Sequence, residues 1–134
     1  MKYILLWVWQ FPQHLVALVI RAILKPETYT IYNSKRIYWV KHNFGVSLGN
    51  YIFLNGKYNT QTVKHEYGHS IQSEYLGFLY LIVVGIPSAI FNNLWDRLFH
   101  KKWPAEKRIQ WYYNRYPEKW ADELGDVKRN AGIF

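Results

Sequence analysis

Two long apolar stretches enclose a middle region in which polar and apolar residues alternate. The first stretch covers residues 3–24 and is interrupted by polar side chains, among them Gln10 and His14. A helix that spans a bilayer needs about 20 mostly apolar residues, and these interruptions argue against one. Because Pro12 suits the first turn of a helix, we predict an apolar N-terminal helix within residues 1–25. We expect it to be buried or to lie at an interface, with a membrane anchor as the alternative.

The second apolar stretch, residues 75–91, contains Gly85 and Pro87. Both residue types weaken or interrupt helices, so we predict a break there. A helix is expected to resume over residues 88–99.

Two further prolines mark helix starts near the end of the chain. Pro104 is expected to begin one helix, because proline favours the first helical position. Pro117 is expected to open a short helix over residues 118–124, and Gly125 suits the position just after its end.

The middle region predicts a small sheet. Residues 28–32, 36–40 and 46–54 are rich in β-branched and aromatic side chains. Asn, Ser and Gly residues separate these runs and predict turns. We therefore expect about three short antiparallel strands.

A central helix should follow the sheet. Asn59 and Thr60 are good N-cap residues, and Gly77 suits the position after a helix end. The helix predicted between them has about sixteen residues. Together these elements predict an α+β fold, and 134 residues fit one domain, residues 1–134.

Composition narrows the chemistry that the chain can support. It contains no cysteine, so thiolate metal ligands are excluded, and only five His and nine Asp plus Glu are present. The net charge of +8 and the many Tyr and Trp residues suit an anionic membrane surface. No recognised nucleic-acid motif accompanies the charge, so we expect no specific nucleic-acid partner.

A metal motif lies on the central helix. Residues His65, Glu66 and His69 match H-E-x-x-H. Positions i and i+4 share one face of a helix, so two imidazoles can bind one Zn²⁺. Glu66 can then act as general base toward a water molecule that the metal activates. Gly68 lies inside this helix, which suggests that a strand or a loop near the metal passes close by.

A catalytic zinc ion normally has three protein ligands. Glu118 is the best third candidate, and Asp122 lies on the same helical face, where it can accept a hydrogen bond from a ligand imidazole. His100 and Asp122 itself are the rival ligands. Gln72 and Ser73 could also lie near the metal, with a polar helix edge as the alternative.

These two segments resemble a known pattern. H-E-x-x-H followed by E-x-x-x-D is similar to the gluzincin metallopeptidases, in particular the HtpX-like membrane metallopeptidases. The resemblance implies a minimal zincin-like domain, with His65, His69 and Glu118 as zinc ligands, Glu66 as general base and Asp122 as a supporting residue. The run from His65 through Gln72 also resembles small bacterial proteins with an H-E-Y-G-H motif, which implies a bacterial origin.

The sequence therefore predicts zinc-dependent hydrolysis of peptide bonds in a peptide or protein substrate. The strand before the central helix could bind the substrate backbone by β-augmentation. A donor for the developing oxyanion is expected among four residues just before Glu118, namely Tyr112, Tyr113, Arg115 and Tyr116. The alternatives are a non-catalytic zinc-stabilised domain and a membrane-surface binding domain.

Overall fold

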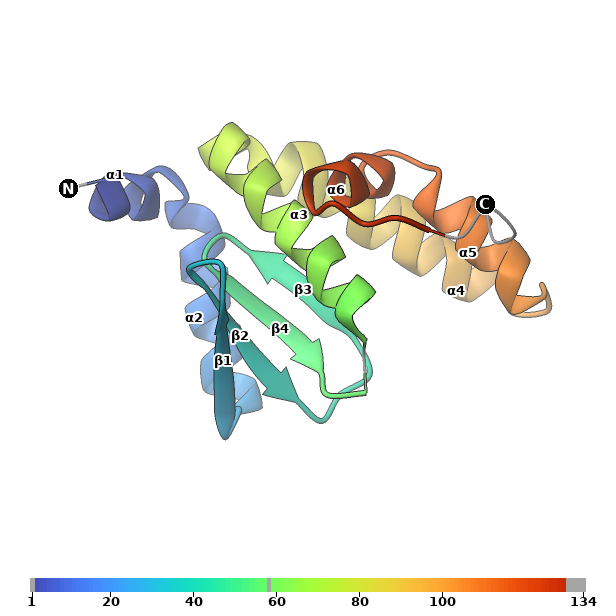
Figure 1. Cartoon of the computed structure of the whole chain (residues 1–134), viewed down its shortest axis with the longest axis horizontal. Coiled ribbons are helices and arrows are strands. Elements are labelled where there is room, and N and C mark those ends of the chain that lie inside the picture. Colours follow the sequence, from blue (N-terminus) through green and yellow to red (C-terminus); the bar gives the residue numbers. More distant parts are fainter. Residues whose placement is uncertain (1, 58, 130–134) are drawn as a thin grey trace.

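The computed structural model describes residues 2–57 and 59–129. Within them, helices surround a four-stranded sheet, so the predicted α+β class is confirmed (Figure 1). The elements follow in the order α1 (Lys2–Trp9), α2 (Phe11–Leu24), β1 (Thr28–Tyr32), β2 (Lys35–Val40), β3 (Gly45–Leu48), β4 (Tyr51–Asn55), α3 (Thr60–Leu76), η1 (Gly77–Leu79), η2 (Leu81–Gly85), η3 (Pro87–Leu94), α4 (Trp95–Phe99), α5 (Ala105–Tyr113) and α6 (Glu118–Leu124).

The sheet differs from the predicted three-stranded antiparallel arrangement. Its strand order is β1-β2-β4-β3, and β2 runs parallel to β4. The single strand expected over residues 46–54 is in fact two antiparallel strands, β3 and β4, which turn at Gly49 and Asn50. Gly49 has a φ of +69°, and a Cβ there would lie 2.4 Å from Nε2 of His14, so the turn requires glycine. Strand β3 pairs with β4 alone and is therefore an edge strand of the sheet.

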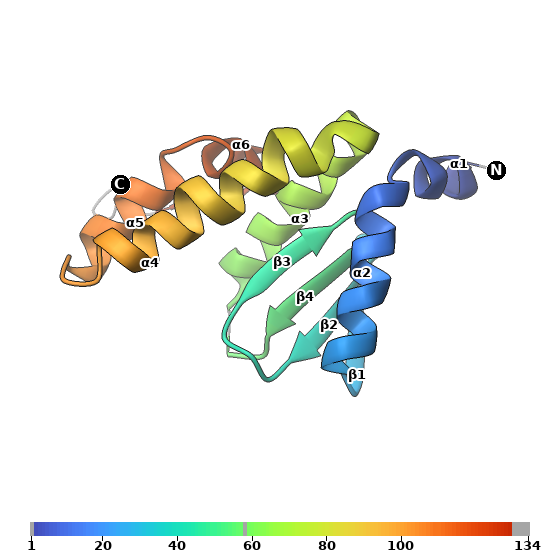
Figure 2. The same ribbon diagram turned by 180° about the vertical axis from the view of Figure 1, so that it is seen from behind.

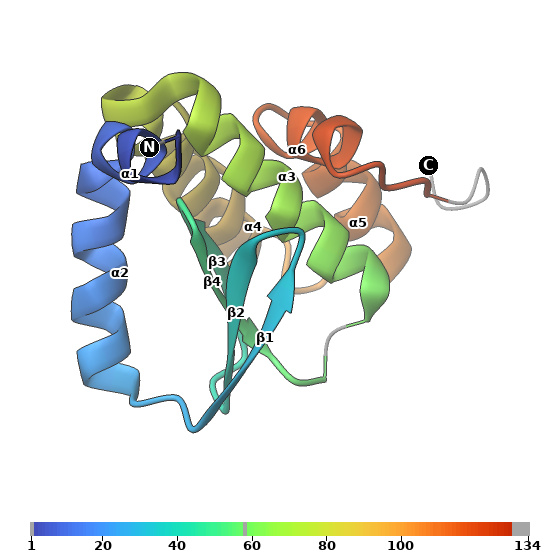
Figure 3. The same ribbon diagram turned by 60° about the vertical axis from the view of Figure 1, so that its left-hand side comes forward.

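Helices cover both faces of the sheet (Figure 3). Ala17 of α2 belongs to the core on one face together with Phe53 of β4. Val63 of α3 packs on the other face against Ile52 and Leu54. Successive side chains of a strand point to opposite faces, so β4 contributes to both cores.

The central helix α3 begins and ends as predicted. The side chain of Asn59 accepts a hydrogen bond from the backbone N–H of Thr62, and Gly77 follows the last helical residue. A Cβ on Gly68 would lie 1.8 Å from the carbonyl oxygen of Ala121. The backbone that passes close to Gly68 is therefore that of helix α6, where we had expected a strand or a loop.

The N-terminal apolar stretch forms two helices where one was predicted. They are bent by 80° near Gln10. The side chains of Gln10 and Gln13 both hydrogen-bond with Ser73 of α3, which holds the bend against that helix. No single helix in the described ranges has the length and apolar character needed to cross a bilayer, although the bent pair α1–α2 has them together.

The second apolar stretch does not break at Gly85 and Pro87, so this prediction was wrong. The helical path continues from η2 through η3 into α4 (Figure 2). Pro87 lacks a backbone N–H, and the helix accommodates it within wide π-type turns. The predicted starts after Pro104 and Pro117 are confirmed, because α5 and α6 begin at the following residues.

Candidate metal centre

Two histidines of α3 and one glutamate of α6 converge on one point. Nε2 of His65 and Nε2 of His69 each lie 2.9 Å from Oε2 of Glu118. The three atoms all lie within 4.8 Å of one another, and the three side chains are buried. Two imidazoles and one carboxylate are a ligand set that can hold a metal ion such as zinc.

The other oxygen of Glu118 is anchored by η3. Oε1 accepts hydrogen bonds from the hydroxyl of Ser88 and from Nδ2 of Asn92. Asn92 also donates to the backbone carbonyl of Tyr116 and accepts from Arg115, which ties η3 to the segment before α6. These contacts leave Oε2 of Glu118 facing the two imidazoles.

Each histidine is also fixed through its outer nitrogen. Nδ1 of His65 lies 2.7 Å from Oδ1 of Asp122, and Nδ1 of His69 lies 2.7 Å from Oε1 of Gln72. The amide nitrogen of Gln72 donates to the carbonyl of Pro117, so its oxygen is the atom that faces His69. Carboxylate and amide oxygens accept hydrogen bonds, and both Nδ1 atoms must therefore carry a proton.

This proton arrangement suits a cation at the point where the three side chains converge. A neutral imidazole carries one N–H, and in both rings Nδ1 uses it. The Nε2 lone pairs of His65 and His69 then point at the acceptor oxygen of Glu118. Without a metal ion, a second proton on an imidazole is the other way to satisfy this oxygen, and the buried charge is then held by the carboxylates of Glu118 and Asp122. A metal ion accepts lone pairs from all three atoms and removes the conflict.

The electrostatics of the cluster favour positive charge. Burial alone would lower the pKa of His65, but the carboxylates of Asp122 and Glu118 outweigh it and raise the pKa to about 9. Burial also opposes the charge on His69, yet Glu118 raises the pKa of this histidine as well. Burial would raise the pKa of Glu118, but the two histidines hold it well below its usual range.

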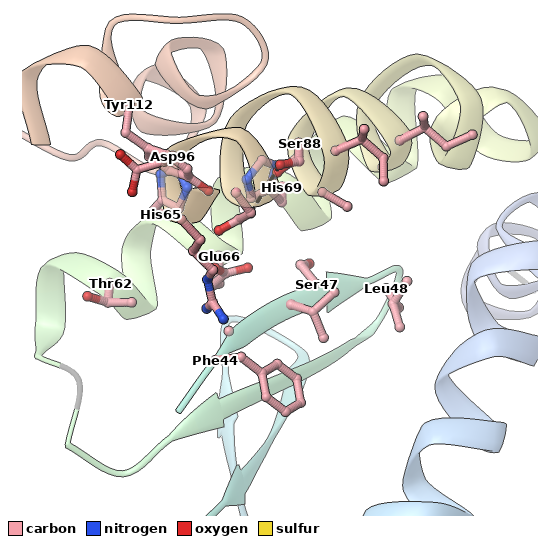
Figure 4. Close-up of a pocket in the computed structure, with 18 of the residues that line it drawn as sticks. Phe44, Ser47, Leu48, Thr62, His65, Glu66, His69, Ser88, Asp96 and Tyr112 are labelled. Atoms are coloured by element: carbon pink, nitrogen blue, oxygen red, sulfur yellow. Dashed lines mark hydrogen bonds between the residues drawn. The ribbon is translucent and has the colours of Figure 1, made fainter. Parts of the chain in front are cut away.

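Glu66 faces a different way from the two histidines. In Figure 4 its carboxylate points from α3 into a pocket, toward β3. Burial raises its pKa, against the opposing charges of His69 and His65. A Cβ on Gly45 of β3 would lie 3.1 Å from Oε1 of Glu66. Among the described residues, no hydrogen bond or ion pair engages this carboxylate, so it is available to a substrate or a water molecule.

The pocket is an open cavity of about 1070 Å³ beside the cluster. Its floor includes β3, and its walls come from α2, η2, η3 and α5. Most of the wall is apolar, with side chains that include Val16, Ile20, Leu81, Ile86 and Ile90. A cavity of this size can hold several residues of an extended apolar peptide.

Of the four residues predicted to stabilise an oxyanion, two line the cavity. Tyr112 and Tyr113 are in its wall, and the ring of Tyr113 meets His65 edge-on at 5.0 Å between centroids. Burial raises the pKa of Tyr113 to about 12, so its hydroxyl keeps its proton. Arg115 bonds to Asn92, and the hydroxyl of Tyr116 donates to the carbonyl of Val83. Neither of these side chains reaches the cavity wall.

The structure does not bring the rival ligands into the cluster. His100 bonds to Asp96 and stacks on Trp103, with ring centroids 3.6 Å apart. The carboxylate of Asp122 is shared between Nδ1 of His65 and the guanidinium of Arg129, so it lies on the outer side of His65, away from Glu118. For Ser73 the sequence left two alternatives, a place near the metal or a polar helix edge. In the structure its hydroxyl hydrogen-bonds with Gln10 and Gln13, so it faces the N-terminal helices.

Sequence reasoning missed three supporting residues. Ser88 and Asn92 anchor Glu118, and Arg129 holds Asp122. A signal for the first two exists, because Ser88 is a polar residue within the apolar stretch 75–91 and Asn92 directly follows that stretch. These two side chains reach Glu118 only because the helix continues through Pro87. The sequence had predicted a break at that proline.

No protein-family model matches the chain, and searches of curated proteins and of solved structures give no significant match.

Proposed function

We propose that this protein is a zinc-dependent peptidase in which His65, His69 and Glu118 hold the metal and Glu66 is the general base. One observation carries the proposal. Both Nδ1 atoms are committed to acceptors, while both Nε2 atoms converge on one oxygen of Glu118. That arrangement is the tautomer and orientation that two histidine ligands need.

The choice of zinc follows from the donor set. Imidazole nitrogens with one carboxylate suit zinc better than magnesium or calcium, which prefer oxygen ligands. A zinc ion bound here would supply a Lewis acid that lowers the pKa of a water molecule toward about 7 and polarises a substrate carbonyl.

Glu66 is suited to move the protons of the reaction. Its free carboxylate would accept a proton from the attacking water and deliver it to the nitrogen of the leaving amine. The raised pKa of Glu66 supports both steps, because a base that also acts as an acid works best with a pKa near the operating pH. Tyr112 and Tyr113 offer hydroxyl donors for the carbonyl oxygen from the cavity wall.

The edge strand β3 offers a way to bind the substrate. It pairs with β4 on one side, and Gly45, Val46 and Ser47 line the cavity. An extended peptide could add to this edge through its backbone. A Cβ on Gly45 would lie 2.8 Å from Cδ1 of Leu54 and 3.1 Å from Oε1 of Glu66, so Gly45→Val would crowd this edge. It should raise KM and leave the zinc content unchanged. Unaltered peptide affinity in this variant would count against the role of the edge.

A purely structural zinc is disfavoured by the number of donors. Structural sites are normally closed by four protein ligands. Within residues 2–57 and 59–129, the cluster contains three side chains that could bind a metal ion. Both of its histidines line the open cavity. A site with three ligands and an open side is typical of catalysis.

The experiment that tests the proposal compares zinc content and peptide cleavage. Zinc per chain is measured by elemental analysis after loading, and cleavage is measured with quenched fluorescent peptides. Wild type should hold about one zinc, and Glu118→Ala should lose most of it. Glu66→Gln should keep zinc and lose cleavage. Glu123→Ala is the matched control, because it removes an exposed acid from the same helix.

Each step can fail separately. A wild-type protein that takes up no zinc would refute the metal site. Full zinc content in Glu118→Ala would refute the ligand assignment. Cleavage that survives Glu66→Gln would remove the general base from the proposal.

A further inference from the structure

We propose that two apolar segments beside the cavity dock on the surface of an anionic phospholipid bilayer. The first segment is α1–α2, and the second runs from η1 to the end of α4 (residues 77–99). Together they are called the apolar rim. This binding does not require the metal. The substrate class that we infer from it below rests on the proposed peptidase function.

The apolar rim exposes large side chains that a water-soluble surface would normally cover. Many of these side chains have at least half of their surface exposed, among them Leu15, Val19 and Ile23 on the first segment and Ile82, Ile86 and Phe91 on the second. Contiguous exposed apolar surface of this kind marks an interaction site.

The two segments lie on one side of the molecule and diverge from a shared corner (Figure 2). At that corner the ring of Trp9 packs edge-on against Phe78, with centroids 5.7 Å apart. Farther along, Val16 of the first segment and Ile86 and Ile90 of the second line the cavity and are also exposed. The apolar rim and the cavity mouth are therefore one continuous surface.

The distribution of charged side chains along the two segments favours a bilayer of anionic lipids as the partner. Residues 1–26 contain no acidic side chain, and the one acid in residues 77–99, Asp96, is ion-paired with Arg108. Basic residues stand at the ends of both segments, where they can meet lipid phosphates: Arg21, Lys25, Arg97, Lys101 and Lys102. Apolar helix faces with flanking Lys and Arg are typical of helices that lie in the membrane interface. The half-exposed rings of Trp9 and Trp95 suit the headgroup region.

Docking in this orientation would open the cavity at the lipid surface. The substrate class would then be apolar peptide segments that lie at or emerge from the bilayer, and they would reach Glu66 without crossing bulk water. A substrate of this kind matches the apolar wall of the cavity.

The test measures partition of the full chain into vesicles by flotation. One set contains phosphatidylglycerol and phosphatidylcholine, and the other contains phosphatidylcholine alone. Ile23→Gln and Ile82→Gln each place a polar group in the rim, and Ile31→Gln makes the same change on β1, outside the rim. All three isoleucines are more than half exposed, so the variants should fold, and a thermal melt verifies it.

We expect wild type to bind anionic vesicles and to bind neutral vesicles at least several-fold more weakly. Ile23→Gln and Ile82→Gln should each weaken binding about tenfold, and Ile31→Gln should bind as wild type. Equal binding by all four proteins, or no binding, would overturn the proposal. Self-association that is lost in the two rim variants without vesicle binding would assign the surface to a second copy of the chain.

The same measurements are made on Glu66→Gln and on zinc-free protein. Vesicle binding should persist in both, because the rim does not include the metal cluster. Loss of peptidase activity and loss of lipid binding are thereby separate outcomes.

Discussion

Removal of the metal should make the stability of this protein depend strongly on pH. Without a cation, His65 lies between the carboxylates of Asp122 and Glu118, which raise its pKa from 6.5 to about 9. A histidine whose pKa is higher in the folded state stabilises the fold fully below pH 6.5. This stabilisation is lost as the pH rises through about 9.

The size of the effect follows from the two pKa values. A change of one pKa unit corresponds to about 1.4 kcal/mol, so the rise from 6.5 to about 9 amounts to about 3 kcal/mol. The low pKa of Glu118 arises from the same contacts and is not added. The raised pKa of Glu66 acts with the same sign, because a carboxyl whose pKa is higher in the folded state loses stability as the pH rises through that pKa. Glu66→Gln removes that second contribution.

The assay is urea unfolding in EDTA between pH 6.5 and pH 9.5. With a slope of about 1–3 kcal/mol per molar urea, the midpoint should fall by roughly 1–3 M across this range. With zinc bound, Nε2 of His65 has no proton to lose, so the midpoint should stay nearly constant. A metal-free midpoint that does not fall, or the same fall in the presence of zinc, would refute the proposed donor arrangement.

Three further changes have expected outcomes of their own. Asp122→Asn should weaken zinc binding about 10–100-fold in competition with a chromophoric chelator, because the ligand imidazole loses its charged acceptor. Ser88→Ala should lower the free energy of unfolding of the metal-free protein by about 1–3 kcal/mol, because Glu118 loses a buried hydrogen bond; an unchanged urea midpoint would contradict that contact. Gly68→Ala should cost about 3 kcal/mol or more, since its Cβ would overlap the backbone of α6, whereas Gly56→Ala, with no atom within 4 Å of its Cβ, should melt like wild type.

The ends of the helices could be predicted because their signals are local. Asn59 and Gly77 bound α3, and Pro104 and Pro117 stand before α5 and α6. Capping hydrogen bonds and the fixed φ of proline act within one turn of the chain. The i, i+4 spacing of His65 and His69 is local in the same way, because it places both side chains on one face of whatever helix forms there.

The sheet and the anchors of the cluster could not be predicted, because they depend on contacts between distant residues. Strand β4 pairs in parallel with β2 because β4, and not β3, lies beside β2. The turn between β3 and β4 is held in part by a hydrogen bond from the backbone N–H of Asn50 to His14, 36 positions earlier. Nothing in the sequence near Ser88 indicates that it meets Glu118. Pro87 predicted a break in the helix, and this was wrong because the wide π-type turns of η3 accommodate a proline.

The buried face of α3 explains why these distant contacts matter. A helix usually packs through an apolar stripe, but most buried side chains of α3 are polar: His65, Glu66, His69, Ser70, Gln72 and Ser73. Buried polar groups stabilise a fold when they are paired. Partners from α6 and η3 complete the cluster, while Gln10 and Gln13 pair with Ser73, one turn after His69. The hydrogen bonds that orient His65 and His69 and those that hold α1–α2 therefore share helix α3.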